Sequence, residues 1–286
     1  MVKGTIENAL LEPPISDLKG KVSLIFTSPP FPLRTKKKYG NLSGEEYLNW
    51  MADLAPRLGE LLTPQGSLVI EIGNAWCPGS PVMSTLPLEA LLRFKSAGNY
   101  ELCQQFICHN PARLPGPAQW VNVERIRVKD SYTHVWWLAR TKRPEADNRR
   151  ILIPYTKSMK GLLKTKRYNA GKRPSGHHVQ PNTFFKDNGG AIPANVLEYS
   201  NTHWSAEYLN HCKATAVKPH PARMAPGLVE FFVNFLTKKD DLVFDPFGGS
   251  NTTGCVAERL GRRWIAVEPC EDYIIGSRGR FPEVAK

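Results

Sequence analysis

Asp245-Pro246-Phe247-Gly248-Gly249-Ser250-Asn251-Thr252-Thr253-Gly254 is the stretch of this chain that decides its fold. It follows the apolar run Leu242-Val243-Phe244 and leads into the helical pattern Val256-Ala257-Glu258-Arg259-Leu260. A strand, a glycine-rich turn and a helix are how a doubly wound α/β sheet presents a ligand at the carboxyl end of a strand. The glycines let backbone approach the ligand closely, because no Cβ intervenes. On these residues alone, a tight turn without a ligand remains the alternative.

The surrounding motifs indicate which ligand the turn would hold. The stretch has neither the lysine of a P-loop nor the spacing of a dinucleotide-binding turn. A second apolar run, Trp264-Ile265-Ala266-Val267-Glu268, ends in an acid about twenty residues further on, where an acid suits a ribose with free hydroxyls. A ribose without a pyrophosphate points to S-adenosylmethionine.

Composition bounds the class of protein. The chain has 286 residues with 41% hydrophobic content, enough for a globular protein with a sizeable core. No apolar run is long enough to span a bilayer, and the first residues do not form a signal peptide. Six cysteines without a C-x-x-C pair favour the reducing cytoplasm. Cys103, Cys108 and His109 are candidate metal ligands, but a buried strand explains them better, so no metal is expected.

The net charge of +12 is concentrated in one segment. Residues 140–180 hold twelve basic residues against two acids, Glu145 and Asp147, and so carry ten of the twelve net positive charges. A basic run is often only a solvated face. A run that carries most of the net charge is better interpreted as a footprint for a polyphosphate partner. The twelve are Arg140, Lys142, Arg143, Arg149, Arg150, Lys157, Lys160, Lys164, Lys166, Arg167, Lys172 and Arg173.

The first half of the chain reads as strands and helices in alternation. Buried strands are predicted over 22–26 and 66–72, helices over 44–62 and 85–97, and further strands over 100–109 and 133–139. The first of these strands runs into Thr27-Ser28-Pro29-Pro30-Phe31, where two prolines stop it. This loop and the glycine turn both end strands of one parallel sheet, so they are expected to meet in one crevice. Glu71 is either a salt-bridged structural acid or an acid facing the same crevice.

Residues 140–218 change character and are expected to form a separate recognition region rather than more of the sheet. The segment is basic, weakly periodic and rich in Gly, Pro, Asn and His. The stretches 173–178 and 186–190 supply turns, donors and charge suited to DNA contacts. A helical pattern then carries Leu228, Phe232 and Leu236 back to the glycine turn.

Taken together, these motifs resemble the amino-group DNA methyltransferases of the permuted β class. In that class a Ser/Asp-Pro-Pro-Phe/Tyr motif precedes the recognition region, and the S-adenosylmethionine motif comes last. Within the class, the chain closely resembles the PvuII-type cytosine-N4-specific methyltransferases of restriction-modification systems. The resemblance covers nearly the whole chain, and its motifs are 27–31, 36–41, 110–115, 125–130, 136–137, 173–177, 186–193, 220–223 and 247–254.

The resemblance implies a Rossmann-like sheet that is circularly permuted, with an inserted DNA target-recognition region. Its expected parts are a catalytic half over 1–139, a recognition region over 140–218 and a cofactor-binding half over 219–286. It implies methyl transfer from S-adenosyl-L-methionine to the exocyclic N4 of cytosine in duplex DNA, at a CAGCTG-like palindrome. A cognate restriction endonuclease would be a functional partner. The alternatives are N6-adenine methylation, methylation of RNA or protein amides, and a DNA-binding protein with an inactive site.

The resemblance also assigns roles to residues. The target base is expected to flip out of the duplex and meet the catalytic residues Ser28, Pro29, Pro30, Phe31 and Glu71. The cofactor-binding residues are Asp245, Pro246, Phe247, Gly248, Gly249, Ser250, Asn251, Thr252, Glu268, His220, Pro221 and Arg223. The DNA-binding residues are Lys36, Lys37, Lys38, Arg173, Ser175, His177 and Lys186.

The chain departs from the pattern of these enzymes at two places, and one further motif excludes a different class of methyltransferase. Gly4-Thr5 stands where a Gly-Asp pair usually helps to bind the cofactor, so either the affinity is weaker or Glu7 substitutes. Glu71 stands where close relatives have aspartate. Pro269-Cys270 is followed by Glu271 rather than by the glutamine of C5-cytosine enzymes, so no cysteine nucleophile is expected.

Overall fold

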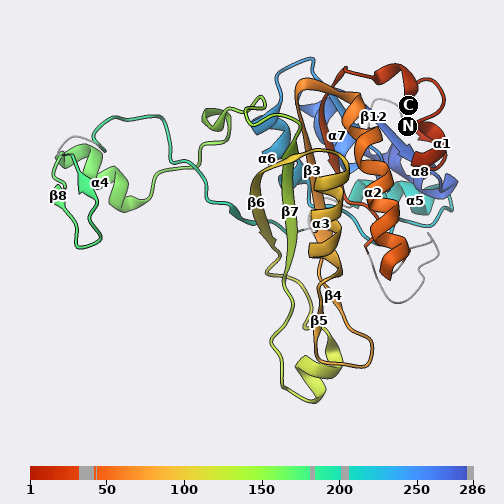
Figure 1. Cartoon of the computed structure of the whole chain (residues 1–286), viewed down its shortest axis with the longest axis horizontal. Helices are drawn as coiled ribbons and strands as arrows, with labels where there is room; N and C mark the ends of the chain where they lie inside the picture. Colours follow the sequence, from red (N-terminus) through yellow and green to blue (C-terminus); the bar gives the residue numbers. More distant parts are fainter. Residues whose placement is uncertain (32–41, 43, 181–183, 201–205, 282–286) are drawn as a thin grey trace. The chain divides into compact units, whose positions relative to one another are not determined.

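The computed structural model describes residues 1–31, 42, 44–180, 184–200 and 206–281 (Figure 1). The chain divides into two compact units. The first comprises Met1–Ala146 and Asn195–Lys286, and the second comprises Asp147–Ala194. The helices of the described residues include none that is both long and apolar enough to cross a membrane.

An eight-stranded sheet forms the centre of the first unit, in the order β1-β12-β11-β2-β3-β7-β6-β10. In the described residues β7 is antiparallel to both of its neighbours, and the other adjacent pairs are parallel. The fold is therefore mixed α/β. The strands are β1 Val2–Lys3, β2 Val22–Thr27, β3 Leu62–Gly73, β6 Glu101–His109, β7 Tyr132–Ala139, β10 Val196–Glu198, β11 Leu242–Asp245 and β12 Arg263–Glu268.

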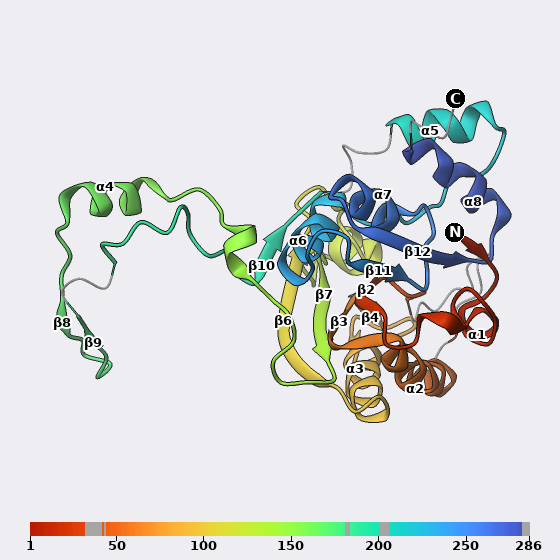
Figure 2. The same ribbon diagram turned by 90° about the horizontal axis from the view of Figure 1, so that it is seen from above.

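Helices cover both faces of this sheet (Figure 2), with α2 and α3 on one side and α6 and α7 on the other. Both faces of β2 are consequently buried, which explains its almost continuously apolar sequence. Ile25 belongs to the core under α2 and α3, whereas Phe26 packs on Phe232 of α6 with ring centroids 5.6 Å apart. The α-helices of the first unit are α1 Ile6–Ala9, α2 Gly44–Leu61, α3 Leu86–Ala97, α5 Ala206–Ala214, α6 Pro226–Leu236, α7 Thr252–Arg259 and α8 Glu271–Ser277.

Shorter elements complete the first unit. A small antiparallel hairpin follows β3, and single helical turns lie in the connecting segments. These elements are β4 Ala75–Trp76, β5 Met83–Ser84, the 3₁₀ turns Ser16–Leu18 and Arg278–Arg280, and the π turn Gln119–Val123.

The strand order joins the beginning and the end of the chain. β11 lies beside β2 in parallel register, with Phe244 opposite Ile25. β12 flanks β11 on one side and β3 flanks β2 on the other, both in parallel. The carboxyl ends of these four strands therefore lie at one edge of the sheet, where ligands bind in α/β folds.

The long periodic elements predicted from sequence are confirmed to within a few residues, but one expectation differs. The strands that end in the two loops are parallel, as expected, while β7 lies antiparallel between β3 and β6. The expectation that residues 140–218 add nothing to the sheet is wrong for β10, which pairs in parallel with β6 at the sheet's edge. A strand of three residues with one buried side chain is too short to give a periodic signal.

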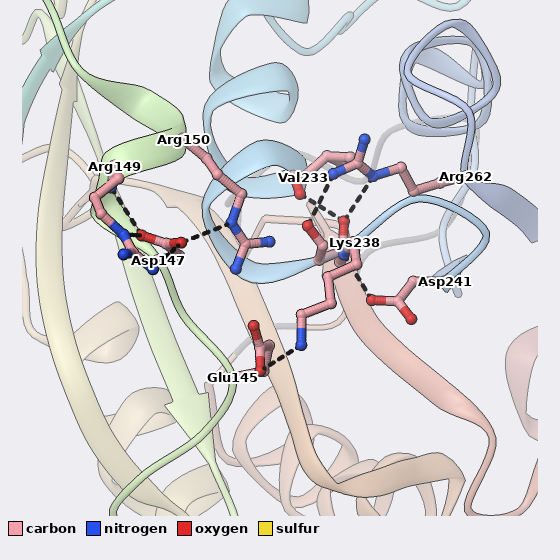
Figure 3. A network of polar contacts seen from close by, with 9 residues as sticks. Glu145, Asp147, Arg149, Arg150, Val233, Lys238, Asp241 and Arg262 are labelled. Atoms are coloured by element: carbon pink, nitrogen blue, oxygen red, sulfur yellow. Dashed lines mark hydrogen bonds and ion pairs between the residues drawn. The ribbon is translucent and has the colours of Figure 1, made fainter. Parts of the chain in front are cut away.

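Polar contacts brace the edge of the first unit near Ala146 (Figure 3). Lys238 Nζ pairs with Glu145 at 3.1 Å, and the Lys238 backbone amide donates to Asp241 at 2.7 Å. Arg262 donates from Nε to the hydroxyl of the buried Thr237 at 3.0 Å and from Nη2 to its carbonyl at 2.8 Å. These bonds tie the end of α6 to the turns that precede β11 and β12.

The second unit has little hydrophobic core. Its helix α4, Lys157–Thr165, starts at the Thr156 cap and buries none of its side chains. A two-stranded hairpin follows, with strands β8 Gly171–Lys172 and β9 His178–Val179, and the 3₁₀ turn Asn148–Ile151 precedes the helix. A unit of this kind presents most of its basic side chains to solvent.

Candidate active site

Two predicted loops meet at the edge where the four parallel strands end. Ser28 follows the last residue of β2, and Asp245 is the last residue of the adjacent β11. On the other side of β2, Thr27 is opposite Ile70 of β3, so Glu71 lies one residue beyond that pair, as Ser28 does. Glu268 ends β12 on the far side of β11. The expected convergence on one crevice is therefore found in the strand register.

A buried hydrogen bond connects the two loops directly. The Thr27 hydroxyl donates to Asp245 Oδ1 at 2.8 Å, and both residues are only 2% exposed. The same carboxylate accepts from the Thr253 hydroxyl at 2.7 Å and from the Phe247 amide at 3.0 Å. Burial raises the pKa of Asp245, against the opposing effect of these hydrogen bonds. Asp245 thus fixes the start of β2's loop relative to the glycine turn.

The glycine turn is shaped to bring backbone close to its neighbours. Gly249 has a φ of +50°, and a Cβ there would lie 3.2 Å from Nε2 of His220. Its amide donates to Glu268 Oε2 at 2.8 Å, and the Cys270 amide donates to Oε1 at 2.9 Å. A Cβ on Gly248 would lie 3.0 Å from the end of the Met1 side chain and 3.1 Å from the Ala266 Cβ, so a larger residue would fit only if a neighbour shifted. Burial raises the pKa of Glu268.

His220 covers this turn as a neutral ring. Its imidazole meets the ring of Tyr273 edge-on, with centroids 4.6 Å apart. Burial lowers the pKa of His220 to about 4, so the ring carries no charge at neutral pH. The His220 amide donates to the Tyr208 hydroxyl at 2.8 Å, and Arg223 donates to the His220 carbonyl at 2.9 Å. Pro221, between them, is exposed.

The residues after the glycines are used mainly to hold the loop. Ser250, Asn251 and Thr252 are buried, and Asn251 caps α7 by accepting from the Gly254 amide at 3.2 Å. Arg280 donates from Nε to the Ser250 carbonyl at 2.6 Å and from Nη2 to its hydroxyl at 3.0 Å. The Ser250 hydroxyl therefore has partners inside the protein, whereas the buried Asn251 Nδ2 has no hydrogen-bond partner among the described residues. Pro246 is also buried.

The Ser-Pro-Pro-Phe loop folds back over the end of β3. Ser28 and Pro30 are half-buried, and Pro29 is buried. The Phe31 ring lies against Gly73, where an added Cβ would be only 2.6 Å from the ring. This contact holds an aromatic ring at the crevice and makes it available for stacking on a planar group.

Glu71 is placed beside this loop in a half-buried polar pair. Its Oε1 accepts from the Thr133 hydroxyl of β7 at 2.9 Å, and Arg113 contributes a favourable charge. Burial is the larger effect and raises the pKa of Glu71. A carboxyl with a raised pKa holds a proton at higher pH than an exposed one, which suits a proton acceptor at a reacting centre.

Glu7 lies close to the glycine turn through an intermediate side chain. It accepts from the Trp50 indole at 2.6 Å, and Trp50 packs on Phe247 with centroids 5.5 Å apart. Burial opposes ionisation of Glu7, but its hydrogen bonds outweigh burial and lower its pKa. The carboxylate that was a candidate substitute for the missing acid is therefore engaged with Trp50.

The predicted DNA-binding residues come from two segments of the chain. Lys36, Lys37 and Lys38 lie outside the described residues. In the second unit, Arg173, Ser175 and His177 form the tip of the β8–β9 hairpin, closed by the Arg173 amide donating to the His177 carbonyl at 2.7 Å. Lys186 is exposed in the segment that follows.

Sequence reasoning missed the residues that lock the site together. Thr27 and Thr253 lie in the motifs 27–31 and 247–254, but neither motif predicts a hydrogen bond from them to Asp245. Arg280 lies in the C-terminal segment, where no motif predicts its hydrogen bond to Ser250. No motif predicts the contacts of Trp50 in α2 with Glu7 and Phe247 either. Thr133 stands opposite Gly73 on β7, a pairing that only the register shows.

The hydrogen-bond acceptors of this site fit a nucleoside that carries an ammonium group. Two buried carboxylates, Asp245 and Glu268, flank a turn whose glycines pack tightly against their neighbours. A carboxylate accepts from ribose hydroxyls or an ammonium group, and after the bonds described above one lone pair remains on Asp245 Oδ2 and on each Glu268 oxygen. Among residues that the structure describes, no group of three metal-ligating side chains is present.

Comparisons with known proteins agree with this geometry. The sequence profile of the DNA methylase family matches residues 22–276. The chain is 44% identical over 262 residues to the type II methyltransferase M.PvuII of Proteus hauseri, covering 91% of this chain and 78% of that protein.

Solved structures give the same result. The PvuII DNA methyltransferase (cytosine-N4-specific) superposes with a TM-score of 0.77 at 35% identity, covering 99% of this chain and 88% of the other. M1.HpyAVI in complex with SAM has a TM-score of 0.56 at 18% identity, covering 98% of this chain and 97% of the other, a likeness of fold alone.

Proposed function

This chain belongs to the DNA methylase family, and on that premise we propose that it transfers a methyl group from S-adenosyl-L-methionine to N4 of cytosine in duplex DNA. The observation that carries the proposal is the buried bond between Thr27 and Asp245. It joins the loop that would hold the target amine to the turn that would hold the cofactor. The likeness to the cytosine-N4-specific PvuII enzyme supports cytosine as the target.

The Ser-Pro-Pro-Phe loop acts on the target amine. The lone pair of an exocyclic amine is delocalised into the ring, so the nitrogen is a poor nucleophile until hydrogen bonds draw it towards sp³ geometry. Ser28 Oγ and the Pro29 carbonyl accept these hydrogen bonds, and Phe31 stacks on the base. With the cofactor bound, its methyl group would pass from sulfur to this nitrogen, and the nitrogen would then give up one proton. Glu71 receives that proton through Ser28, in keeping with its raised pKa.

The glycine turn holds the cofactor, which supplies an electrophilic methyl group on a sulfonium when bound. Asp245 binds the methionine amino group, and Glu268 binds the ribose hydroxyls. Gly248 and Gly249 give backbone approach, and His220 covers the pocket as a neutral ring that does not repel the sulfonium. Holding both reactants in line supplies much of the rate by proximity.

The basic segment supplies the DNA contacts. Residues 140–218 are the proposed target-recognition region, with Arg173, Ser175, His177 and Lys186 among the residues that meet DNA. The exposed hairpin tip and the excess of ten positive charges over 140–180 support this assignment. A base inside a duplex cannot reach Ser28, so the target flips out at a cost of a few kcal/mol. Because the basic residues of this segment would neutralise phosphates, affinity for DNA should fall steeply with salt.

The wider setting is a restriction-modification system. The proposed site is a CAGCTG-like palindrome, and an endonuclease cutting that sequence would be the functional partner. The protein would work in the cytoplasm, where its six cysteines, all free thiols, stay reduced.

Substitution of the proposed catalytic serine tests the function. Ser28→Ala should lower turnover with plasmid DNA by about 10²-fold or more, since the amine loses a hydrogen-bond acceptor and its route for the proton. The dissociation constants for cofactor and DNA should stay within about twofold. Ser23→Ala, near the start of the strand that leads to Ser28, is the matched control. Unchanged turnover in Ser28→Ala would remove this role from Ser28.

A further inference from the structure

A second pocket lies outside the crevice, between the β4–β5 hairpin and the segment 110–131. Its volume is about 370 Å³, within the range of small-ligand sites. β4 and β5 and the yellow-green segment around Gln119–Val123 extend together beyond the end of β3 (Figure 1). We call residues 74–85 and 110–131 the arm.

The lining of this pocket is apolar and aromatic with a cationic rim. Trp76, Val82 and Met83 come from the hairpin, and Val128 comes from the facing segment. Arg127 and Lys129, on either side of Val128, also line it. An aromatic and aliphatic surface beside two cations is suited to a flat heterocycle attached to a phosphate backbone.

Internal hydrogen bonds hold the walls in place. Arg127 Nε donates to the Pro81 carbonyl at 2.9 Å and so ties the segment to the hairpin. Lys129 Nζ donates to the Pro111 carbonyl at 3.1 Å. Both side chains remain exposed, and each has further N–H donors than these bonds use. The pocket is therefore shaped before any ligand arrives.

The arm starts where the catalytic loop is anchored. Gly73, the last residue of β3, lies against the Phe31 ring. The next residue, Asn74, donates a hydrogen bond to Asp130 of the arm at 2.8 Å. Asp130 and Tyr132 both line the pocket. The wall of the pocket is thus tied, through Asn74 and Asp130, to the strand end that contacts Phe31.

Exposed apolar side chains on the arm indicate a partner. Val128 is 86% exposed and Val82 is 52% exposed, although both line the pocket. The segment 110–131 has four basic residues and two acids, a charge that complements DNA rather than a basic or neutral protein surface. The basic residues are Arg113, Arg125, Arg127 and Lys129, and the acids are Glu124 and Asp130.

We propose that this pocket binds an unstacked nucleobase of the substrate DNA that flanks the target base. The proposal rests on the proposed function, because it takes DNA as the substrate. The base would stack on Trp76 and the aliphatic walls, while Arg127 and Lys129 contact the adjoining phosphates. Holding a neighbouring nucleotide would keep the duplex open while the target base occupies the crevice.

Two matched variants test the pocket. Val128→Glu places a carboxylate in the pocket, and Val123→Glu makes the same charge change on the arm at an exposed valine that does not line the pocket. Loss of one stacked base corresponds to about 5- to 100-fold in affinity. Val128→Glu should therefore weaken DNA binding by about that factor, against about twofold for Val123→Glu.

An abasic scan identifies the occupant. A duplex carrying the mapped methylation site is made with one abasic position at a time around the target, and affinities are measured for the wild type and both variants. One flanking position should weaken the wild type but not weaken Val128→Glu further. Equal losses in the two variants, or no position with such coupling, would overturn the proposal.

The same titrations separate this inference from the proposed function. If the wild type methylates the duplex and both variants bind it alike, only the nucleobase pocket is wrong. If the wild type neither binds nor methylates DNA, the proposed function fails with it.

Discussion

The hydrogen bond between Thr27 and Asp245 should control both stability and turnover. Thr27→Val keeps the side-chain volume but removes the donor, leaving Asp245 Oδ1 with the Phe247 amide alone. Both residues are 2% exposed, so water does not replace the lost partner. A buried hydrogen bond to a carboxylate contributes about 1.5–3 kcal/mol to the free energy of unfolding. At about 2–4 °C per kcal/mol, the melting temperature should fall by about 3–12 °C.

The effect on turnover follows from the position of Thr27. It immediately precedes Ser28, so loss of the bond frees the loop that holds the target amine. Misplacement by about 1 Å costs about 10²-fold in rate. Turnover at saturating cofactor and DNA should therefore fall by about 10- to 100-fold in Thr27→Val. Stopped assays with labelled cofactor measure the rate, and calorimetry measures cofactor affinity.

Two controls make the test specific. Thr27→Ser keeps the hydroxyl and should retain most of the turnover. Thr253→Val removes the other hydroxyl that Asp245 accepts, at 2.7 Å, but leaves the two loops joined. It should lower stability and cofactor affinity while affecting saturated turnover less. If Thr27→Val turns over as fast as Thr253→Val at saturation, the bond does not align the two loops.

Three further predictions concern the walls of the site. Arg280→Met removes both donors to Ser250 and should lower the free energy of unfolding by about 1.5–3 kcal/mol and weaken cofactor binding, measured by thermal melting and calorimetry. His220 has a folded pKa of about 4 against an ordinary value of 6.5, so the unfolded state binds its proton first and stability is lost as pH falls from about 6.5 to about 4. His220→Asn should lack that part of the loss in melting curves across this range. Gly73→Ala puts a Cβ 2.6 Å from the Phe31 ring, so the ring must move. The activation free energy calculated from turnover should therefore change more than the free energy of unfolding does.

Specific outcomes contradict each of these predictions. Cofactor affinity unchanged in Arg280→Met would mean that the Ser250 turn holds its shape unaided. Identical pH profiles for wild type and His220→Asn would mean that His220 titrates normally in the folded protein. Gly73→Ala is compared with Phe31→Ala: if the double variant loses the product of the two single losses, the two residues do not act together.

The sequence could predict the elements that bury continuous or periodic apolar faces. β2 and β11 are short apolar runs followed by loops that contain Pro or Gly. In α2, apolar residues such as Tyr47, Met51 and Leu58 recur at helical spacing. Because parallel strand ends share one edge, the placement of Ser28 and Asp245 at the same edge of the sheet followed from these patterns.

Other features depend on contacts that local patterns do not encode. β10 is too short for a periodic signal and is defined by its pairing with β6. The partners of Asp245 and Ser250 come from Thr27 and Arg280, which lie 218 and 30 residues away along the chain. The pocket of the arm is formed by two segments that each look like polar, proline-containing loops. Such long-range pairings are set by tertiary packing, so a single sequence does not reveal them.

Identification of the methylated nucleoside tests the central claim most directly. The purified protein is incubated with S-adenosylmethionine and unmethylated plasmid, and the DNA is digested to nucleosides. Chromatography and mass spectrometry then separate the candidate products against standards. The account predicts N4-methyldeoxycytidine. N6-methyldeoxyadenosine would contradict cytosine as the target, and no methylated nucleoside from a protein that still binds the cofactor would contradict DNA as the substrate.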